Sequence, residues 1–92
     1  MVKSELIDRL AEQQPHLDFK DVEFAVTTIL EQMTEELSNG GRVEIRGFGV
    51  FTSRKKPAHI GRNPQTGEQV SVPERYGLHF KAGKPLLESL NQ

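Results

Sequence analysis

The sequence has no cysteine and no tryptophan, and it contains no long run of apolar residues. Without cysteine the chain can form neither disulfide bonds nor thiolate metal sites. Without a long apolar run it has no segment suited to crossing a membrane. The first ten residues, MVKSELIDRL, also lack the apolar stretch of a secretory signal. We therefore expect a cytoplasmic protein.

Motifs typical of active sites are missing as well. The chain contains neither G-x-x-x-x-G-K-[ST] nor G-x-G-x-x-G, and its Gly-Phe-Gly unit at residues 47–49 precedes a predicted strand instead of a helix. The histidines His16, His59 and His79 do not share a spacing typical of metal ligands. Most carboxylates fall on solvent-facing helix positions. We therefore expect no catalytic residues, no metal, no cofactor and no small-molecule substrate, so that the protein is not an enzyme.

The net charge of −1 conceals a strong asymmetry along the chain. Residues 1–40 hold three basic and nine acidic residues, a net charge of −6, whereas residues 41–92 hold nine basic and four acidic residues, a net charge of +5. If the fold keeps these halves apart, one face can attract a polyanion while the other keeps the protein soluble.

Residues 1–40 show the periodicity of helices. A length of 92 residues, of which 35% are hydrophobic, is sufficient for a single domain, which we place over residues 1–92. Pro15 ends a first helix that begins at Lys3, and Asp18 is suited to cap a second helix with a continuous apolar stripe. The Asn-Gly-Gly sequence at residues 39–41 ends that helix. We expect these residues to form a helical body.

The periodicity changes from about 3.6 to about 2 near residue 41. Residues 41–52 and 70–81 alternate between apolar and polar side chains, and a Gly-Phe-Gly turn interrupts the first of these segments. In the second segment Arg75, His79 and Lys81 fall opposite the apolar side chains. These patterns predict a three-stranded antiparallel sheet with one apolar and one basic face. A short C-terminal helix over residues 82–92 completes an α+β fold.

Residues 53–69 have almost no aliphatic side chains and cannot bury a face. The Asn-Pro-Gln-Thr sequence at residues 63–66 suits a type I turn, and Gly67 can adopt a positive φ directly after it. The segment is therefore predicted to form a long two-stranded ribbon that protrudes from the sheet. At the rise of a β-strand, such an arm reaches about 30 Å.

The arm combines positive charge with a proline at its tip. Pro64 has a plain interpretation as a turn residue, but its surroundings favour a second one. A rigid apolar ring at the end of a cationic ribbon is a device by which proteins open a base step from the minor groove of DNA. The basic side chains of the arm can then pair with the phosphates on either side of the groove; they are Arg54, Lys55, Lys56, His59 and Arg62.

Three segments carry a resemblance to a known family. The sequences GFGVF at 47–51, GRNPQTG at 61–67 and HFKAGK at 79–84, in this order after two helices, resemble the bacterial histone-like family of HU and integration host factor. The likeness covers nearly the whole chain. Arg46 within EIRGFG, together with Tyr76 and His79 within RYGLHF, is more similar to the beta subunit of integration host factor than to HU.

The resemblance implies an intertwined dimer, either a homodimer or a heterodimer with a paralogous alpha subunit, that bends double-stranded DNA in the nucleoid. It implies that Pro64 of each arm inserts into a base step and that Arg62 and Asn63 flank this wedge. It also implies that Arg46 lies at the minor groove beside the body. The remaining residues that it assigns to the arm or to phosphates are Lys56, His59, Lys3, Lys81 and Lys84, and Arg75 lies on the same basic face of the sheet. Free N–H groups at predicted helix starts near Lys3 and Lys84 agree with phosphate binding.

The chain departs from the family pattern at several positions. His59 and Ile60 stand where the family usually has arginine and threonine, Gln65 and Gln69 are neutral, and the helical half is unusually acidic. We therefore expect weaker nonspecific DNA binding than in HU. Because histidine commonly changes its charge near neutral pH, we expect His59 to add a phosphate contact only when protonated.

A function of another class stays open. The ribbon could be an exchange arm between subunits of a protein-interaction or assembly module whose acidic helices face a basic partner. That hypothesis accounts for the acidic half of the chain, but poorly for nine basic residues and an exposed proline in the other half. Structured RNA is less favoured as a ligand, because A-form helices suit a bending wedge badly.

Overall fold

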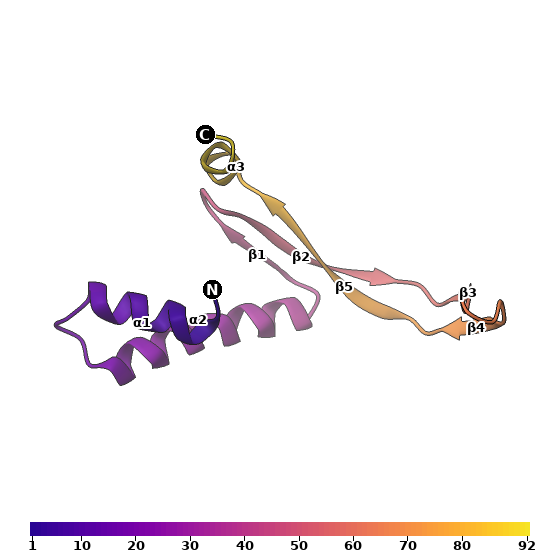
Figure 1. The fold of residues 1–92 in the computed structure, drawn as a ribbon, viewed down its shortest axis with the longest axis horizontal. Helices are drawn as coiled ribbons and strands as arrows, with labels where there is room; N and C mark the ends of the chain where they lie inside the picture. The colour runs from indigo at the N-terminus through magenta and orange to yellow at the C-terminus, as the bar shows by residue number, and fades with distance from the viewer. The chain divides into compact units, whose positions relative to one another are not determined.

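A computed structural model describes residues 1–92 (Figure 1). Two helices come first, α1 (Lys3–Gln13) and α2 (Phe19–Ser38). Five strands and a last helix follow: β1 (Arg42–Ile45), β2 (Gly49–Lys56), β3 (His59–Arg62), β4 (Gln69–Val72), β5 (Arg75–Ala82) and α3 (Lys84–Leu90). The α+β class that the sequence predicts is confirmed. The chain consists of two compact units, Met1–Glu35 and Glu36–Gln92.

The first unit is a pair of helices with a very small core. Ile7 of α1 and Val22 and Val26 of α2 are its buried hydrophobic residues, and partly buried neighbours on α1 pack against them. The helices form where the sequence predicts them because their apolar residues recur at helical spacing. The backbone carbonyl of Asp18 accepts the N–H groups of Asp21 and Val22 at the start of α2.

Glycines shape the turns of the second unit. Gly40 follows the end of α2 with φ +79°, a conformation that favours glycine. Between β1 and β2, Gly47 has φ +84°, and Phe48 donates its N–H to the carbonyl of Ile45 over 2.9 Å. This confirms the tight turn that the Gly-Phe-Gly sequence predicts.

The three-stranded antiparallel sheet has the order β1-β2-β5. Its register places Val43 opposite Phe51 and Phe51 opposite Phe80, so these three side chains share one face. The rings of Phe51 and Phe80 are 4.6 Å apart between centroids, and the ring of Phe48 joins them from the turn. One face of the sheet is therefore apolar and partly aromatic.

The arm consists of two stretches of paired strand. The outer halves of β2 and β5 pair as far as Lys56 and Arg75, and β3 and β4 form a separate two-stranded sheet that begins with His59 opposite Val72. Each connecting pair of residues contains a proline, Pro57 on one side and Pro73 on the other. Proline has no N–H to donate to a strand ladder, so the ladder is interrupted at this level.

The tip of the arm is a closed loop. Asn63 donates its N–H to the carbonyl of Glu68 over 2.8 Å, and Gly67 donates its own to the carbonyl of Asn63 over 2.7 Å. Gly67 has φ +75°, as the sequence predicts. The bond from Gly67 spans one residue more than the four-residue turn expected from the sequence, because the left-handed glycine takes part in closing the loop.

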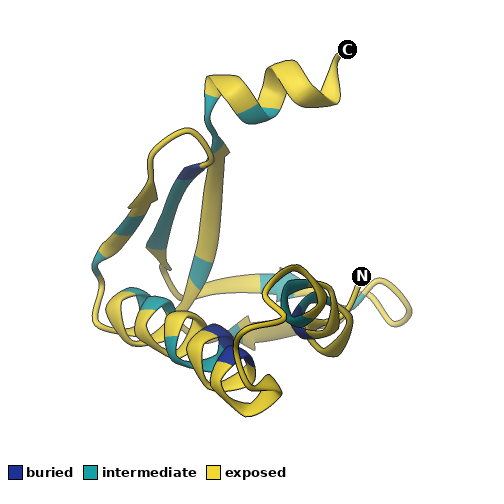
Figure 2. Ribbon diagram, turned by 90° about the vertical axis from the view of Figure 1, so that its left-hand side faces the viewer, coloured by how far each residue is buried: buried dark blue, intermediate teal, exposed yellow.

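Few residues of the chain are buried, and they lie on the helix pair and at the start of β2 (Figure 2). The apolar face of the sheet is largely open to solvent in a single chain: Tyr76 is 69% exposed and Leu78 is 64% exposed. None of the helices combines the length and the apolar content needed to cross a lipid bilayer.

Candidate nucleic-acid interface

The basic face of the sheet contains a shallow hollow. Arg42 of β1 lies opposite Thr52 of β2, which in turn lies opposite His79 of β5. Residues opposite each other share a face, so all three strands contribute to this hollow of about 330 Å³. The side chains around it are those of Arg42, Val50, Thr52, Arg54, His79 and Lys81. The hydroxyl oxygen of Thr52 is buried and has no hydrogen-bond partner within the chain. The hollow thus offers the cationic side chains of Arg42, Arg54 and Lys81 to an anionic ligand.

Arg42 and Thr52 belong to this surface, although no motif in the sequence singles them out as binding residues. Arg42 forms an ion pair with Glu44 over 2.6 Å, and both side chains are well exposed. Pairs of this kind contribute little to stability and can be exchanged for another anion. The signal that could have found Arg42 is the strand register, which aligns it with Thr52 and His79.

Positive charge continues along the arm on the same face. Lys56 lies directly opposite Arg75, and Arg54 lies two residues earlier opposite Gly77. The side chain of Lys56 reaches over Gly77, where a Cβ atom would lie 2.8 Å from Cε of the lysine. Like charges that face each other across two strands destabilise the pair. This arrangement leaves an unneutralised charge that suits a polyanion.

Lys55 lies on the opposite face of the sheet from these basic residues, because successive side chains of a strand alternate between the two faces. It lies opposite Tyr76 on the apolar face and forms an ion pair with Glu74 over 3.3 Å. The structure therefore brings Arg54, Lys56 and Arg75 together and places Lys55 on the other side.

At the tip, Pro64 is exposed at the outermost turn. Asn63 builds that turn, since its side-chain oxygen accepts the N–H of Gln65 over 2.9 Å. Arg62 donates from Nη1 to the carbonyl of Gly67 over 3.3 Å, which holds the guanidinium group beside the loop. The proline ring is thus presented on a hydrogen-bonded loop with a cation next to it.

His59 lies on the face of β3 opposite to that of Arg62, because the two residues are three positions apart along the strand. Its Nδ1 atom is 3.4 Å from the carbonyl oxygen of Pro57, and the side chain is exposed. No buried or ion-paired environment fixes the imidazole. It is therefore free to meet a ligand on that side of the arm.

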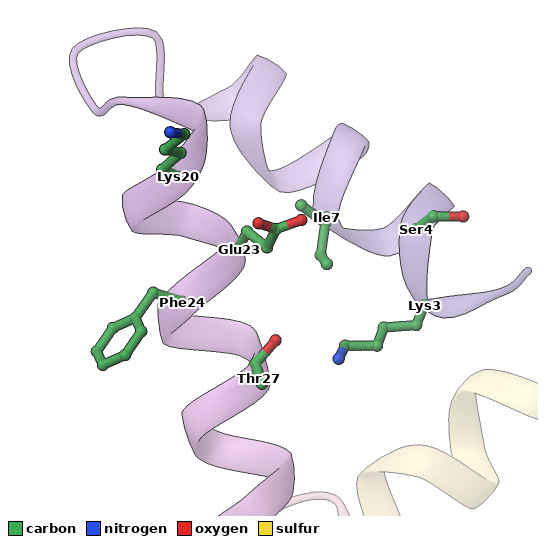
Figure 3. Close-up of a pocket in the computed structure, with 7 residues that line it drawn as sticks. All are labelled: Lys3, Ser4, Ile7, Lys20, Glu23, Phe24 and Thr27. Atoms are coloured by element: carbon green, nitrogen blue, oxygen red, sulfur yellow. The ribbon is translucent and has the colours of Figure 1, made fainter.

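The remaining candidates occupy turns and helix starts. Arg46 is exposed in the turn between β1 and β2. Lys84 begins α3 and lies 3.8 Å from Glu88. Lys3 begins α1, whose N-terminal N–H groups receive no side-chain cap. With Ser4, Lys20, Glu23 and Phe24 it borders a hollow between α1 and α2 (Figure 3).

No group of three or more histidine, aspartate or glutamate side chains is arranged to hold a metal ion. Three carboxylates of the second unit instead act as partners of basic residues. Glu44, Glu74 and Glu88 each pair with an arginine or lysine. This surface therefore presents mainly cationic side chains, some of which are already paired with carboxylates.

The model of one protein family, described as bacterial DNA-binding protein, matches residues 1–91. The chain belongs to this family. Its curated relatives in the family include integration host factor subunits beta. That of Halorhodospira halophila is 57% identical over 91 residues, covering 99% of this chain and 89% of the relative. That of Nitrosospira multiformis is 54% identical over 92 residues, covering 100% of this chain and 98% of the relative.

Solved structures of this bacterial DNA-binding family have the same fold. The HU protein in an Anabaena HU–DNA cocrystal structure matches with a TM-score of 0.84 and 38% identity, covering 98% of this chain and 97% of that one. HU from Thermotoga maritima matches with a TM-score of 0.65 and 34% identity, covering 98% of both chains. The resemblance to the HU and integration host factor family that the sequence indicates is confirmed.

Proposed function

We propose that this bacterial DNA-binding protein is an architectural protein that bends duplex DNA, with Pro64 as a wedge in the minor groove. The observation that carries the proposal is the exposed proline on a hydrogen-bonded loop at the end of a basic two-stranded arm. The similarity to an HU protein in a cocrystal with DNA supports it. So does the likeness to integration host factor subunits beta.

The wedge suits base-step opening for a physical reason. Unstacking one base step costs a few kcal/mol, and proteins offset this cost through the additional contacts that a bent duplex makes. A pyrrolidine ring enters the stack without the desolvation that a charged side chain would require. The loop from Asn63 to Glu68 fixes the ring in place, because two backbone hydrogen bonds close it. A preformed tip loses little conformational entropy when it inserts.

Binding to the phosphates is assigned to the basic face of the sheet and the arm. The hollow of about 330 Å³ with Arg54, His79 and Lys81 supplies a surface for the duplex backbone. Arg46, Lys3 and Lys84 extend the contacts at turns and helix starts. Phosphate contacts carry little sequence information, so the preference for a site comes mainly from DNA deformability and from narrow minor grooves that suit Arg46.

The active form is a dimer, either with an identical chain or with a paralogous alpha subunit. The supporting observation is the small core of one chain, in which Ile7, Val22 and Val26 are the buried hydrophobic residues. Ile29 on α2 is 59% exposed although it belongs to the apolar stripe of that helix. A chain of this size needs more buried apolar surface to be stable, and a second subunit supplies it. A dimer also provides two arms, which place a wedge on each side of the bend.

Such a protein acts on chromosomal DNA in the cytoplasm, as part of the nucleoid. The bending can serve recombination, transcription or DNA condensation. The proposed function requires no catalysis, because the protein acts by deforming the duplex.

The deciding experiment measures fluorescence energy transfer between dyes at the two ends of a duplex. Saturating protein should shorten the distance between the ends. An unchanged transfer efficiency, with binding confirmed by anisotropy, would exclude bending. The alternative of an assembly module with an exchange arm predicts that short duplex DNA does not compete with its self-association at moderate salt.

A further inference from the structure

Ile60 is an isolated apolar residue on the outer part of the arm. Its side chain is 70% exposed. It lies on β3, which pairs with β4 in a separate two-stranded sheet, and it takes no part in the buried cluster of the helix pair. The fold of this chain therefore gives the isoleucine side chain no apolar surface to pack against.

The strand register places Ile60 on the same face of the arm as Arg62. Ile60 lies opposite Ser71, and Arg62 lies opposite Gln69. Side chains directly opposite each other and side chains two residues apart share a face of a strand pair. Ile60 and Arg62 are thus neighbours on one face, and the residues of the other face are His59, Gly61, Val70 and Val72.

The two faces of this strand pair differ in solvent exposure. The first face carries Ile60 and Arg62, and the second carries His59, Gly61, Val70 and Val72. On the second face, Gly61 and Val72 are half-buried, and a Cβ atom at Gly61 would lie 3.6 Å from Cγ2 of Val72. That face is partly covered by its own side chains. On the first face, Ile60 and Arg62 are both exposed. The first face therefore presents the guanidinium group of Arg62 beside the exposed aliphatic side chain of Ile60, next to the tip that holds Pro64.

We propose that Ile60 lies against the floor of the minor groove and makes the arm discriminate against G·C base pairs, an inference that rests on the function proposed above. In the minor groove all base pairs present acceptors, and G·C differs by the N2 amino group of guanine, a hydrogen-bond donor. An aliphatic side chain has no acceptor for this donor and displaces the water that would satisfy it. A buried donor without a partner is costly. A·T pairs have no such group, so they meet no such penalty.

The test uses inosine, which lacks the 2-amino group of guanine. Two duplexes of identical sequence are compared, one with guanosine and one with inosine at every G·C position, and dissociation constants are measured at fixed salt. Wild-type protein should bind the inosine duplex about tenfold more tightly. In Ile60→Thr the difference should fall to about twofold or less, because threonine keeps the β-branched shape and supplies a hydroxyl acceptor.

A matched control separates this effect from the greater flexibility of inosine DNA. Val70→Thr makes the same kind of change on the opposite face of the arm, so its discrimination should equal that of the wild type. Equal discrimination in Ile60→Thr and wild-type protein would overturn the role of Ile60, and so would equal affinity of the wild type for both duplexes. Either result leaves the proposed function intact if end-to-end energy transfer still reports bending. Loss of bending on both duplexes would instead refute the proposed function.

Discussion

The ring of Phe80 lies over Gly49 on the neighbouring strand, so closely that a Cβ atom at residue 49 would be 2.5 Å from its Cε1 atom. The same Cβ atom would lie 2.7 Å from the backbone carbonyl oxygen of Lys81. No side-chain rotation can relieve that contact. Gly49→Ala should therefore destabilise the protein by about 1–3 kcal/mol through overpacking. Urea denaturation at fixed protein concentration measures the change.

Gly61→Ala is the control for that substitution. Its Cβ atom would make an ordinary contact of 3.6 Å with Val72, so we expect a change within about 0.5 kcal/mol. If both variants lose equal stability, the close approach of Phe80 to Gly49 is not the cause.

Replacing the wedge should separate bending from affinity. In Pro64→Ala the loop keeps its two backbone hydrogen bonds, because neither involves the proline, but the rigid ring is lost. We expect the bend measured by energy transfer to decrease strongly, with an affinity loss of less than about tenfold. Gln65→Ala, which truncates the adjacent exposed side chain, should bend DNA like the wild type. A normal bend in Pro64→Ala would exclude the wedge.

The basic residues of the arm should contribute unequally. Arg62→Ala should lower the slope of log K against log salt by about one unit and weaken binding, while the bend of the bound duplex is retained. Lys55→Ala should have a smaller effect on the slope, since Lys55 lies on the apolar face and is already paired with Glu74. Salt titrations by fluorescence anisotropy provide both slopes. Equal slopes for the two variants would contradict the assignment of the DNA-binding face.

Stability should depend on protein concentration. Because the dimer is proposed to bury apolar residues that one chain exposes, a hundredfold dilution should lower Tm by on the order of 5 °C. Circular dichroism or calorimetry over this range provides the measurement. A monomeric protein would show the same Tm at every concentration.

The sequence predicts those parts of the fold that depend on local patterns. Apolar residues at helical spacing and Pro15 locate α1 to within one residue of its observed end at Gln13. The turn glycines Gly47 and Gly67 adopt the positive φ values that their neighbours require. These features are predictable because each is determined by a few adjacent residues.

Features that depend on strand register were not predictable in the same way. The pairing of Lys56 with Arg75, nineteen positions later in the sequence, decides which basic residues share a face. It also decides that Arg42 joins the hollow with Thr52 and that Lys55 does not belong to the basic face. Alternation along one strand indicates two faces, but the partner strand determines which distant side chains meet. The roles assigned to the individual DNA-binding residues stay predictions for the experiments above.

The proline-containing gaps in the arm have a mechanical consequence. Strand pairing stops at Lys56 and Arg75 and resumes at His59 and Val72. A change of direction between the two paired segments therefore breaks no interstrand hydrogen bond. Four residues without strand pairing thus connect the inner and outer segments of the arm. If the protein bends DNA as proposed, we expect this connection to let the tip adapt to duplexes of different curvature while the inner segment keeps its pairing.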